Sequence, residues 1–238
     1  MAIEVFNRYE NKHLVNREQQ EQLLSDLQAK MELDKHNPNG KAYKIYNLYY
    51  DTSDNNLIRR SLEKPRYKEK VRVRAYGVVA GDDMVFVEIK KKYDGLVNKR
   101  RTKMTLSDAK QFLENAEIEL QTYMNPQVVN ELAEIIGRRK LRPAINIAYE
   151  RTALIDPRDS DLRVSFDHAI ATRRHDVGLD KEAVGEYLLP DDQYVMEVKT
   201  RHAMPLWLAE LLGKHHVRAV SFSKYGREYI KKLKEEHV

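Results

Sequence analysis

Three short segments each carry a glutamate and a lysine two residues apart, a combination that could do chemistry on anions. They are Glu10-Asn11-Lys12, Glu88-Ile89-Lys90 and Glu197-Val198-Lys199, and they lie far apart in the sequence. Residues two apart on a strand point to the same face, so each segment presents an acid and a base together. Such pairs also form ordinary cross-strand salt bridges, but three occurrences favour one shared site.

Basic residues extend this pattern in a further segment, residues 70–76. The even positions there carry Lys70, Arg72 and Arg74, while the odd positions are apolar or small and carry no charge. A period of two is typical of β-strands, in which alternate side chains point to opposite faces. The same alternation recurs in three other segments, which are residues 84–90, 162–167 and 195–199.

The charged faces of these segments raise the question of what they meet in the folded protein. If helices cover the opposite faces of Val, Ile and Leu, the charged faces point inward. Like charges would then repel each other unless something negative lies between them. For any one strand taken alone, a solvated face remains the alternative. The expected interior residues are Glu10, Lys12, Arg72, Arg74, Glu88, Lys90, Lys99, Arg101, Arg151, Arg163, Glu197 and Lys199.

A ligand with several phosphate groups would suit this set of side chains. Basic residues outnumber acidic ones in it, and phosphate matches the charge and donor geometry of Arg and Lys. Carboxylates cannot bind phosphate directly, but carboxylate and phosphate oxygens together bind Mg²⁺ or Mn²⁺. The sequence therefore predicts a phosphate-binding interior with a divalent metal ion. A conventional nucleotide-binding fold is not expected, because the chain has neither a Walker loop nor a G-x-G-x-x-G motif.

The elements that must position these residues are mainly strands. About eight or nine are expected, which is enough for a large antiparallel sheet or a closed barrel in an α+β fold. No internal repeat or linker divides the chain, so we expect one domain over residues 1–238. The expected strands are residues 3–14, 43–51, 70–76, 84–90, 97–104, 143–154, 162–167, 195–199 and 217–224.

Helices are expected between the strands, packed on the outside of the sheet. Their apolar residues recur at helical spacing, and their starts carry residues that cap helices. Four helix starts are expected, at a capping box formed by Asn16 and Gln19, at a cap on Ser107, at Asn125-Pro126 and at Pro205. A basic amphipathic helix is expected at residues 225–236.

Composition limits the class of protein. The chain of 238 residues has a formal net charge of +5, so a basic binding region must come from clustering and not from bulk charge. It contains no cysteine, which excludes disulfides, thiolate metal sites and a cysteine nucleophile. Neither a signal peptide nor an apolar run of the roughly 20 residues needed to span a membrane is evident. We therefore expect a soluble cytoplasmic protein.

Several motifs, taken in order, resemble the catalytic domain of the vacuolar transporter chaperone (VTC) polyphosphate polymerases, within the triphosphate tunnel metalloenzyme superfamily with its CYTH-like fold. Each motif alone is weak, but their order and spacing along nearly the whole chain are specific. The matching segments are residues 8–12, 47–52, 70–77, 85–90, 99–101, 149–153, 197–199 and 221–225.

This resemblance implies an antiparallel β-barrel that forms a tunnel, with helices packed outside it. It also implies a role for each matching residue. Lys12, Arg72, Arg74, Lys90, Arg151 and Lys224 would be the catalytic phosphate ligands. Lys99, Arg101, Arg163, Lys199, Ser223 and Tyr149 would bind phosphate further along the tunnel. Glu197 would be the main ligand of Mn²⁺ or Mg²⁺, with Glu88 and Glu10 as further candidates.

The function implied by the resemblance is transfer of the γ-phosphate of ATP onto a growing inorganic polyphosphate chain, with release of ADP. The alternatives are an inorganic or nucleoside triphosphatase of the same fold and a non-catalytic module that binds polyphosphate or RNA. The triphosphatase branch has E-x-E-x-K on its first strand, whereas this chain has Arg8 at the first position, which favours the polymerase. ATP and polyphosphate are thus the expected partners, and nucleic acid is not.

Overall fold

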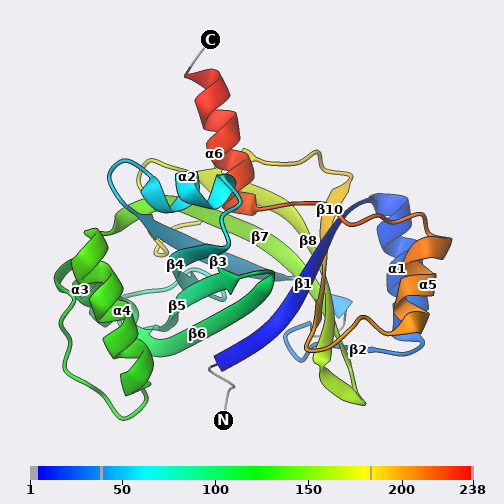
Figure 1. Cartoon of the computed structure of the whole chain (residues 1–238), viewed down its shortest axis with the longest axis horizontal. Coiled ribbons are helices and arrows are strands. Elements are labelled where there is room, and N and C mark those ends of the chain that lie inside the picture. Colours follow the sequence, from blue (N-terminus) through cyan, green and yellow to red (C-terminus); the bar gives the residue numbers. More distant parts are fainter. Residues whose placement is uncertain (1–4, 38–39, 183, 237–238) are drawn as a thin grey trace.

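The structure is a computed structural model that describes residues 5–37, 40–182 and 184–236. Ten strands and six helices lie in this part of the chain (Figure 1). The strands are β1 (Val5–Asn16), β2 (Glu32–Leu33), β3 (Tyr43–Asp51), β4 (Tyr67–Ala75), β5 (Met84–Tyr93), β6 (Leu96–Thr105), β7 (Arg142–Asp156), β8 (Asp159–Arg173), β9 (Glu186–Tyr187) and β10 (Gln193–Thr200). The helices are α1 (Arg17–Gln28), α2 (Asn56–Leu62), α3 (Leu106–Asn115), α4 (Pro126–Arg139), α5 (Leu206–Lys214) and α6 (Lys224–Glu235).

Eight of the described strands form a closed antiparallel ring. Their order is β7-β3-β4-β5-β6-β1-β10-β8, and the pairing of β8 with β7 closes the ring. The two-residue strands β2 and β9 add to β7 and β8 at its margins. This arrangement confirms the predicted α+β fold with an antiparallel barrel of about eight or nine strands. Each of these eight strands pairs with a neighbour on both sides, and the shortest pairing is that of β1 with β6, over four residues of each strand.

Helices α3 and α4 cover one side of the ring (Figure 1). Val73 of β4 and Val87 of β5 share a core with Phe112 of α3 and Leu132 of α4, and all four side chains are almost completely buried. Because alternate residues of a strand point to opposite faces, this outer core turns the even-numbered residues of β4 and β5 toward the interior. The apolar stripe of the helices therefore decides which face of these strands is enclosed.

Helices α1 and α5 cover another side of the ring (Figure 1). Leu23 of α1 and Leu208 of α5 are fully buried against Val164 of β8 and Met196 of β10. These contacts leave Glu197, which neighbours Met196, on the inner face of β10.

Helices α2 and α6 lie at one end of the ring, which we call the α6 end (Figure 1). A third apolar cluster fills part of the interior there, where Ile45 of β3 and Ile147 of β7 pack with Phe222 and Tyr225. The interior is therefore apolar on the β3 and β7 side at this end, and the charged residues occupy the rest. Among the described residues, no helix has the length and hydropathy needed to span a membrane.

Two features of the helices differ from the prediction. Helix α3 begins after Thr105 and not at Ser107, because the Thr105 side chain accepts a hydrogen bond from the backbone N–H of Asp108. Helix α2 was not predicted at all. Its first turn is held by Asp51 from β3, whose carboxylate accepts the backbone N–H groups of Leu57 and Ile58. A cap supplied from outside the helix leaves no local capping pattern.

The prediction of a strand at residues 217–224 is wrong. This segment makes one isolated bridge, between His13 and Ala219, and then enters α6 at Lys224. Phe222 packs in the apolar cluster at the α6 end, and Ser223 is the N-cap of the helix. In the sequence, an apolar residue that packs a loop onto the core can thus be mistaken for an apolar position of an alternating strand.

The predicted capping box at the start of α1 is confirmed. Asn16 Oδ1 accepts the backbone N–H of Gln19 at 2.8 Å, and the Gln19 side chain accepts the backbone N–H of Asn16 at 3.2 Å. We expect Asn16→Ala to lower the free energy of unfolding by about 1 kcal/mol, as loss of such a cap does elsewhere. Denaturant titration measures this, with Glu21→Ala on the exposed face of the same helix as the control. Equal stability of the two variants would contradict the prediction.

Candidate phosphate-binding interior

Charged side chains from the ring strands and the start of α6 meet inside the ring. They form two clusters of ion pairs, each built around buried carboxylates. The Glu88 cluster consists of Glu88, Arg72, Arg74 and Lys99. The Asp167–Glu197 cluster consists of Asp167, Glu197, Lys12, Arg151, Lys199 and Lys224.

Glu88 lies among three cations and has 1% of its surface exposed. Arg72 Nη2 lies 2.7 Å from Oε2, and Lys99 Nζ lies 2.7 Å from Oε1. Arg74 Nε is more distant, at 4.0 Å from Oε2. Burial raises the pKa of Glu88, but the three cations outweigh it and hold the pKa well below its ordinary value. Glu88 is therefore ionised at neutral pH and orients the cations around it.

The two arginines of this cluster are also held by neutral groups from β3 and β7. Arg72 Nη1 donates to Tyr49 Oη at 2.9 Å, and Arg74 Nε donates to Asn47 Oδ1 at 2.9 Å. Arg74 Nη2 donates to Tyr149 Oη at 3.1 Å. Both guanidinium groups are thus fixed in place by several partners, as preorganised stabilisation of a developing charge requires.

Glu197 is the common partner of four cations from four elements. Lys199 Nζ lies 2.9 Å from Oε2, while Lys12 Nζ lies 3.4 Å from Oε1. Lys224 Nζ is 3.4 Å from Oε1, and Arg151 Nη2 is 3.6 Å from Oε2. Burial raises the pKa of Glu197, but these cations outweigh it and hold the pKa well below the ordinary value. Three of these four contacts are longer than a typical direct hydrogen bond.

Asp167 is a residue of this site that sequence reasoning missed. Its side chain is fully buried, and it accepts hydrogen bonds from Arg151 Nε at 2.6 Å and Arg151 Nη2 at 2.8 Å. Lys224 Nζ contacts the same carboxylate. Asp167 shares its strand face with Ser165 and Arg163, so the alternation in residues 162–167 could have placed it inside. Its partners could not be read from that pattern.

Glu10 and Lys90 form a third ion pair in the interior, between β1 and β5. Burial raises the pKa of Glu10, but the neighbouring Lys90 and Lys199 outweigh it and lower the pKa to about 2. Every lysine and arginine predicted as a catalytic ligand therefore contacts an interior carboxylate. The structure brings that predicted group together.

Three other predicted residues lie toward the edges of this site. Arg101 stacks its guanidinium 4.3 Å from the centre of the Phe86 ring. Arg163 lies 3.9 Å from Asp34 with 43% of its side chain exposed, so it belongs to the rim of the ring opposite α6. Ser223 caps α6 at the other end, where its hydroxyl also meets Lys70. Lys70 faces the interior but was absent from the predicted set, although it shares the face of Arg72.

The predicted metal ligands of this interior are Glu10, Glu88 and Glu197. Among the described residues, no group of three or more acidic or histidine side chains could hold a metal ion. Glu10 and Glu197 nevertheless lie on paired strands, and the Glu197 carboxylate opposes the lowering of the pKa of Glu10. Mg²⁺ typically binds one or two carboxylates and completes its shell with substrate phosphates and water. Of the three predicted metal ligands, Glu197 suits that mode best, because three of its four cations lie 3.4 Å or more from its oxygens. Glu10 and Glu88 each have a cation within 2.7 Å.

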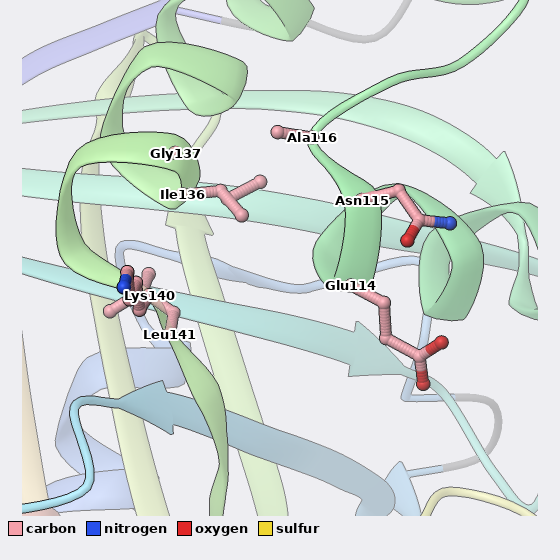
Figure 2. A pocket seen from close by; sticks show the side chains of 7 residues that line it. All are labelled: Glu114, Asn115, Ala116, Ile136, Gly137, Lys140 and Leu141. Atoms are coloured by element: carbon pink, nitrogen blue, oxygen red, sulfur yellow. The ribbon is translucent and has the colours of Figure 1, made fainter.

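A surface pocket of about 270 Å³ lies away from this interior, between the ends of α3 and α4 (Figure 2). Glu114 and Asn115 line it from α3, and Ile136 and Lys140 line it from the end of α4. It contains none of the predicted site residues and one acidic and one basic side chain.

Comparisons of sequence agree with the motifs in this interior. A model of the VTC domain family matches residues 7–231. The chain is also similar to vacuolar transporter chaperone complex subunit 4 of Schizosaccharomyces pombe, with 25% identity over 228 residues. That alignment covers 76% of this chain and 30% of the relative, so the chain spans less than a third of the length of that protein.

A comparison of structures shows the same fold in another protein. A candidate adenylate cyclase of Bacillus halodurans aligns with a TM-score of 0.56 and 15% identity, covering 93% of this chain and 96% of that one. A candidate adenylate cyclase of Vibrio parahaemolyticus aligns with a TM-score of 0.47 and 9% identity, covering 93% and 98%. At 15% identity, the first likeness supports the fold and not a shared activity.

Proposed function

Because the chain belongs to the VTC domain family, we propose that it is a polyphosphate polymerase that transfers the γ-phosphoryl group of ATP onto inorganic polyphosphate. One observation carries this proposal. Two clusters of preorganised cations face the same enclosed interior, and their carboxylates are too few to neutralise the described basic side chains there. A chain of phosphates supplies many anionic oxygens in one narrow ligand.

Binding would exchange internal ion pairs for contacts with phosphate. Arg72, Arg74 and Lys90 would bind from β4 and β5, and Arg151 and Lys224 would bind from the opposite wall. The carboxylates that now orient these cations would keep them in place. Further contacts would come from the other matching residues, which are Lys12, Lys99, Arg101, Arg163, Lys199, Tyr149 and Ser223.

Transfer needs no nucleophile from the protein. A terminal oxygen of the polyphosphate would attack the γ-phosphorus of ATP, forming a new P–O bond, while the bond from the γ-phosphorus to the bridging oxygen of ADP breaks. The attacking oxygen is already anionic, so it needs little help from a base. The arginines and lysines would align both groups and neutralise charge that builds up on the transferred phosphoryl group.

Glu197 would be the main ligand that holds Mn²⁺ or Mg²⁺ next to the phosphates. The ion would neutralise phosphate charge and help to align the reacting groups. Glu88 suits a different role, because Arg72 and Lys99 already occupy its oxygens at 2.7 Å. We propose that it positions these two cations.

Incubation with ATP tests this function. We expect ADP and an acid-labile polymer to form together when Mn²⁺ or Mg²⁺ is present, and both to be absent when EDTA removes the metal. ADP is measured by chromatography and the polymer by gel electrophoresis. Free phosphate without polymer would instead indicate a triphosphatase, in which water is the acceptor. Metal-independent, salt-sensitive binding of polyphosphate or RNA without turnover would indicate a binding module.

A further inference from the structure

Lys70 lies in the ring interior at the α6 end and has no role in the mechanism above. Its Nζ donates a hydrogen bond to Ser223 Oγ at 2.9 Å, across 153 residues of sequence. Ser223 is the N-cap of α6, where its hydroxyl accepts the backbone N–H of Gly226 at 3.1 Å. Lys70 therefore connects the inner face of β4 with the first turn of α6.

Lys70 differs from its neighbours in its partners. Within the described residues, no carboxylate lies at ion-pair distance from its amino group, and Ser223 is its hydrogen-bond partner. Five other interior lysines each contact a carboxylate: Lys12, Lys90, Lys99, Lys199 and Lys224.

The charged groups that affect Lys70 most are cations. Lys90 is its cross-strand partner on β5, Lys12 approaches from β1, and Lys68 and Arg72 flank it on β4. Burial lowers the pKa of Lys70, and these four cations lower it further, to about 7. An isolated cation in such a place is unfavourable in the free protein, and an anion would relieve the repulsion.

The position of Lys70 also favours a linear anion over a compact one. Lys70, Arg72 and Arg74 occupy successive inward positions of β4, which are about 6 to 7 Å apart along a strand. They form a line from the α6 end toward the Glu88 cluster. A chain of phosphates can contact all three cations, whereas a single phosphate cannot.

We propose that Lys70 and Ser223 form an additional phosphate subsite at the α6 end, which holds inorganic polyphosphate beyond the groups bound by Arg72 and Arg74. The proposal rests on the proposed function and names a part of the same interior. The N-terminus of α6, with its partial positive charge, adds to the attraction at this subsite.

Binding measured without catalysis tests the subsite. The probes are long-chain inorganic polyphosphate and inorganic tripolyphosphate, in EDTA at constant ionic strength. We expect Lys70→Met to weaken binding of the long chain roughly tenfold, as loss of a charge-assisted hydrogen bond does. Tripolyphosphate should lose less affinity, because it can bind Arg72 and Arg74 alone. Lys70→Arg should keep most of the affinity for the long chain.

The matched control is Lys44→Met, which changes a lysine of β3 whose side chain is 56% exposed. Its affinities should equal those of the unchanged protein. Without ligand, Lys70→Met should raise the melting temperature, because it removes an unpaired cation. A purely structural role for Lys70 would predict the opposite shift, and a lower melting temperature would therefore overturn the proposal.

Proton uptake gives a second readout. Above about pH 7 the Lys70 amine is largely neutral in the free protein, and a bound anion favours its protonated form. Binding of long-chain polyphosphate at pH 8 should therefore take up protons. Calorimetry in buffers of different ionisation enthalpy measures this uptake, which should be smaller for Lys70→Met.

Besides a lower melting temperature, two outcomes would overturn the subsite. The first is equal affinity of Lys70→Met and Lys44→Met for the long chain, and the second is proton uptake that Lys70→Met leaves unchanged. If the unchanged protein makes polymer from ATP while either outcome holds, the subsite alone is wrong. If the unchanged protein binds no polyphosphate, both the subsite and the proposed function are wrong.

Discussion

Glu197→Gln is expected to lower the rate of metal-dependent polymer synthesis on the order of a hundredfold or more. The amide keeps the size of the side chain but removes the charge that faces Lys12, Lys199, Lys224 and Arg151. It also removes the carboxylate that we propose as the main metal ligand. Polyphosphate binding in EDTA should not weaken, because the four cations lose their competing internal anion. The variant thus separates binding from turnover.

The measurements are ADP release and polymer length at saturating Mn²⁺, together with polyphosphate affinity in EDTA. Glu228→Gln is the matched control, because Glu228 is also buried and binds Arg174 Nε and Nη2 at 2.6 and 2.7 Å, outside the site. It should lower stability and leave the rate of synthesis nearly unchanged. Normal synthesis by a folded Glu197→Gln protein would refute the metal-binding role of Glu197.

Asp167→Asn is expected to have the largest effect on stability. The carboxylate of Asp167 is fully buried and is shared by Arg151 and Lys224. Its loss leaves two cations in the interior without their main partner, and breaking a buried pair in this way costs about 3–5 kcal/mol. Inorganic polyphosphate should restore part of the lost stability, because its phosphates can take the place of the missing carboxylate.

Denaturant titration with and without polyphosphate measures both effects. Asp176→Asn is the control, since Asp176 forms an exposed ion pair with Lys181 at 2.6 Å. That change should leave the stability unaltered, as is usual for surface pairs. If Asp167→Asn behaved like this control, the Asp167–Glu197 cluster would not be the internal support that we describe.

Much of the site was predictable because the alternation of side chains along a strand decides which of them share a face. Alternation along β4, β5 and β10 placed Arg72, Glu88 and Glu197 on the faces that the structure encloses. The match of the VTC domain family to residues 7–231 confirms the resemblance carried by those motifs. The beginnings of α1, α4 and α5 were predictable for a similar reason, because each is specified by residues next to the helix.

Residues far apart in sequence explain what could not be predicted. Asp167 on β8 meets Lys224 on α6 across 57 residues, and no local pattern connects them. The segment before α6 follows the packing of Phe222 with Ile45 and Ile147 and does not form a strand. In each case a tertiary contact outweighs the local preference.

The sequence by itself determined that these strands have one charged face and one apolar face, since that follows from the spacing of side chains along a strand. Only the tertiary structure decided which face is enclosed and which charges become neighbours. Closure of the ring through β7 and β8 and burial of the apolar faces under the helices settle this. Both depend on contacts between distant segments, where alternation carries no information about partners.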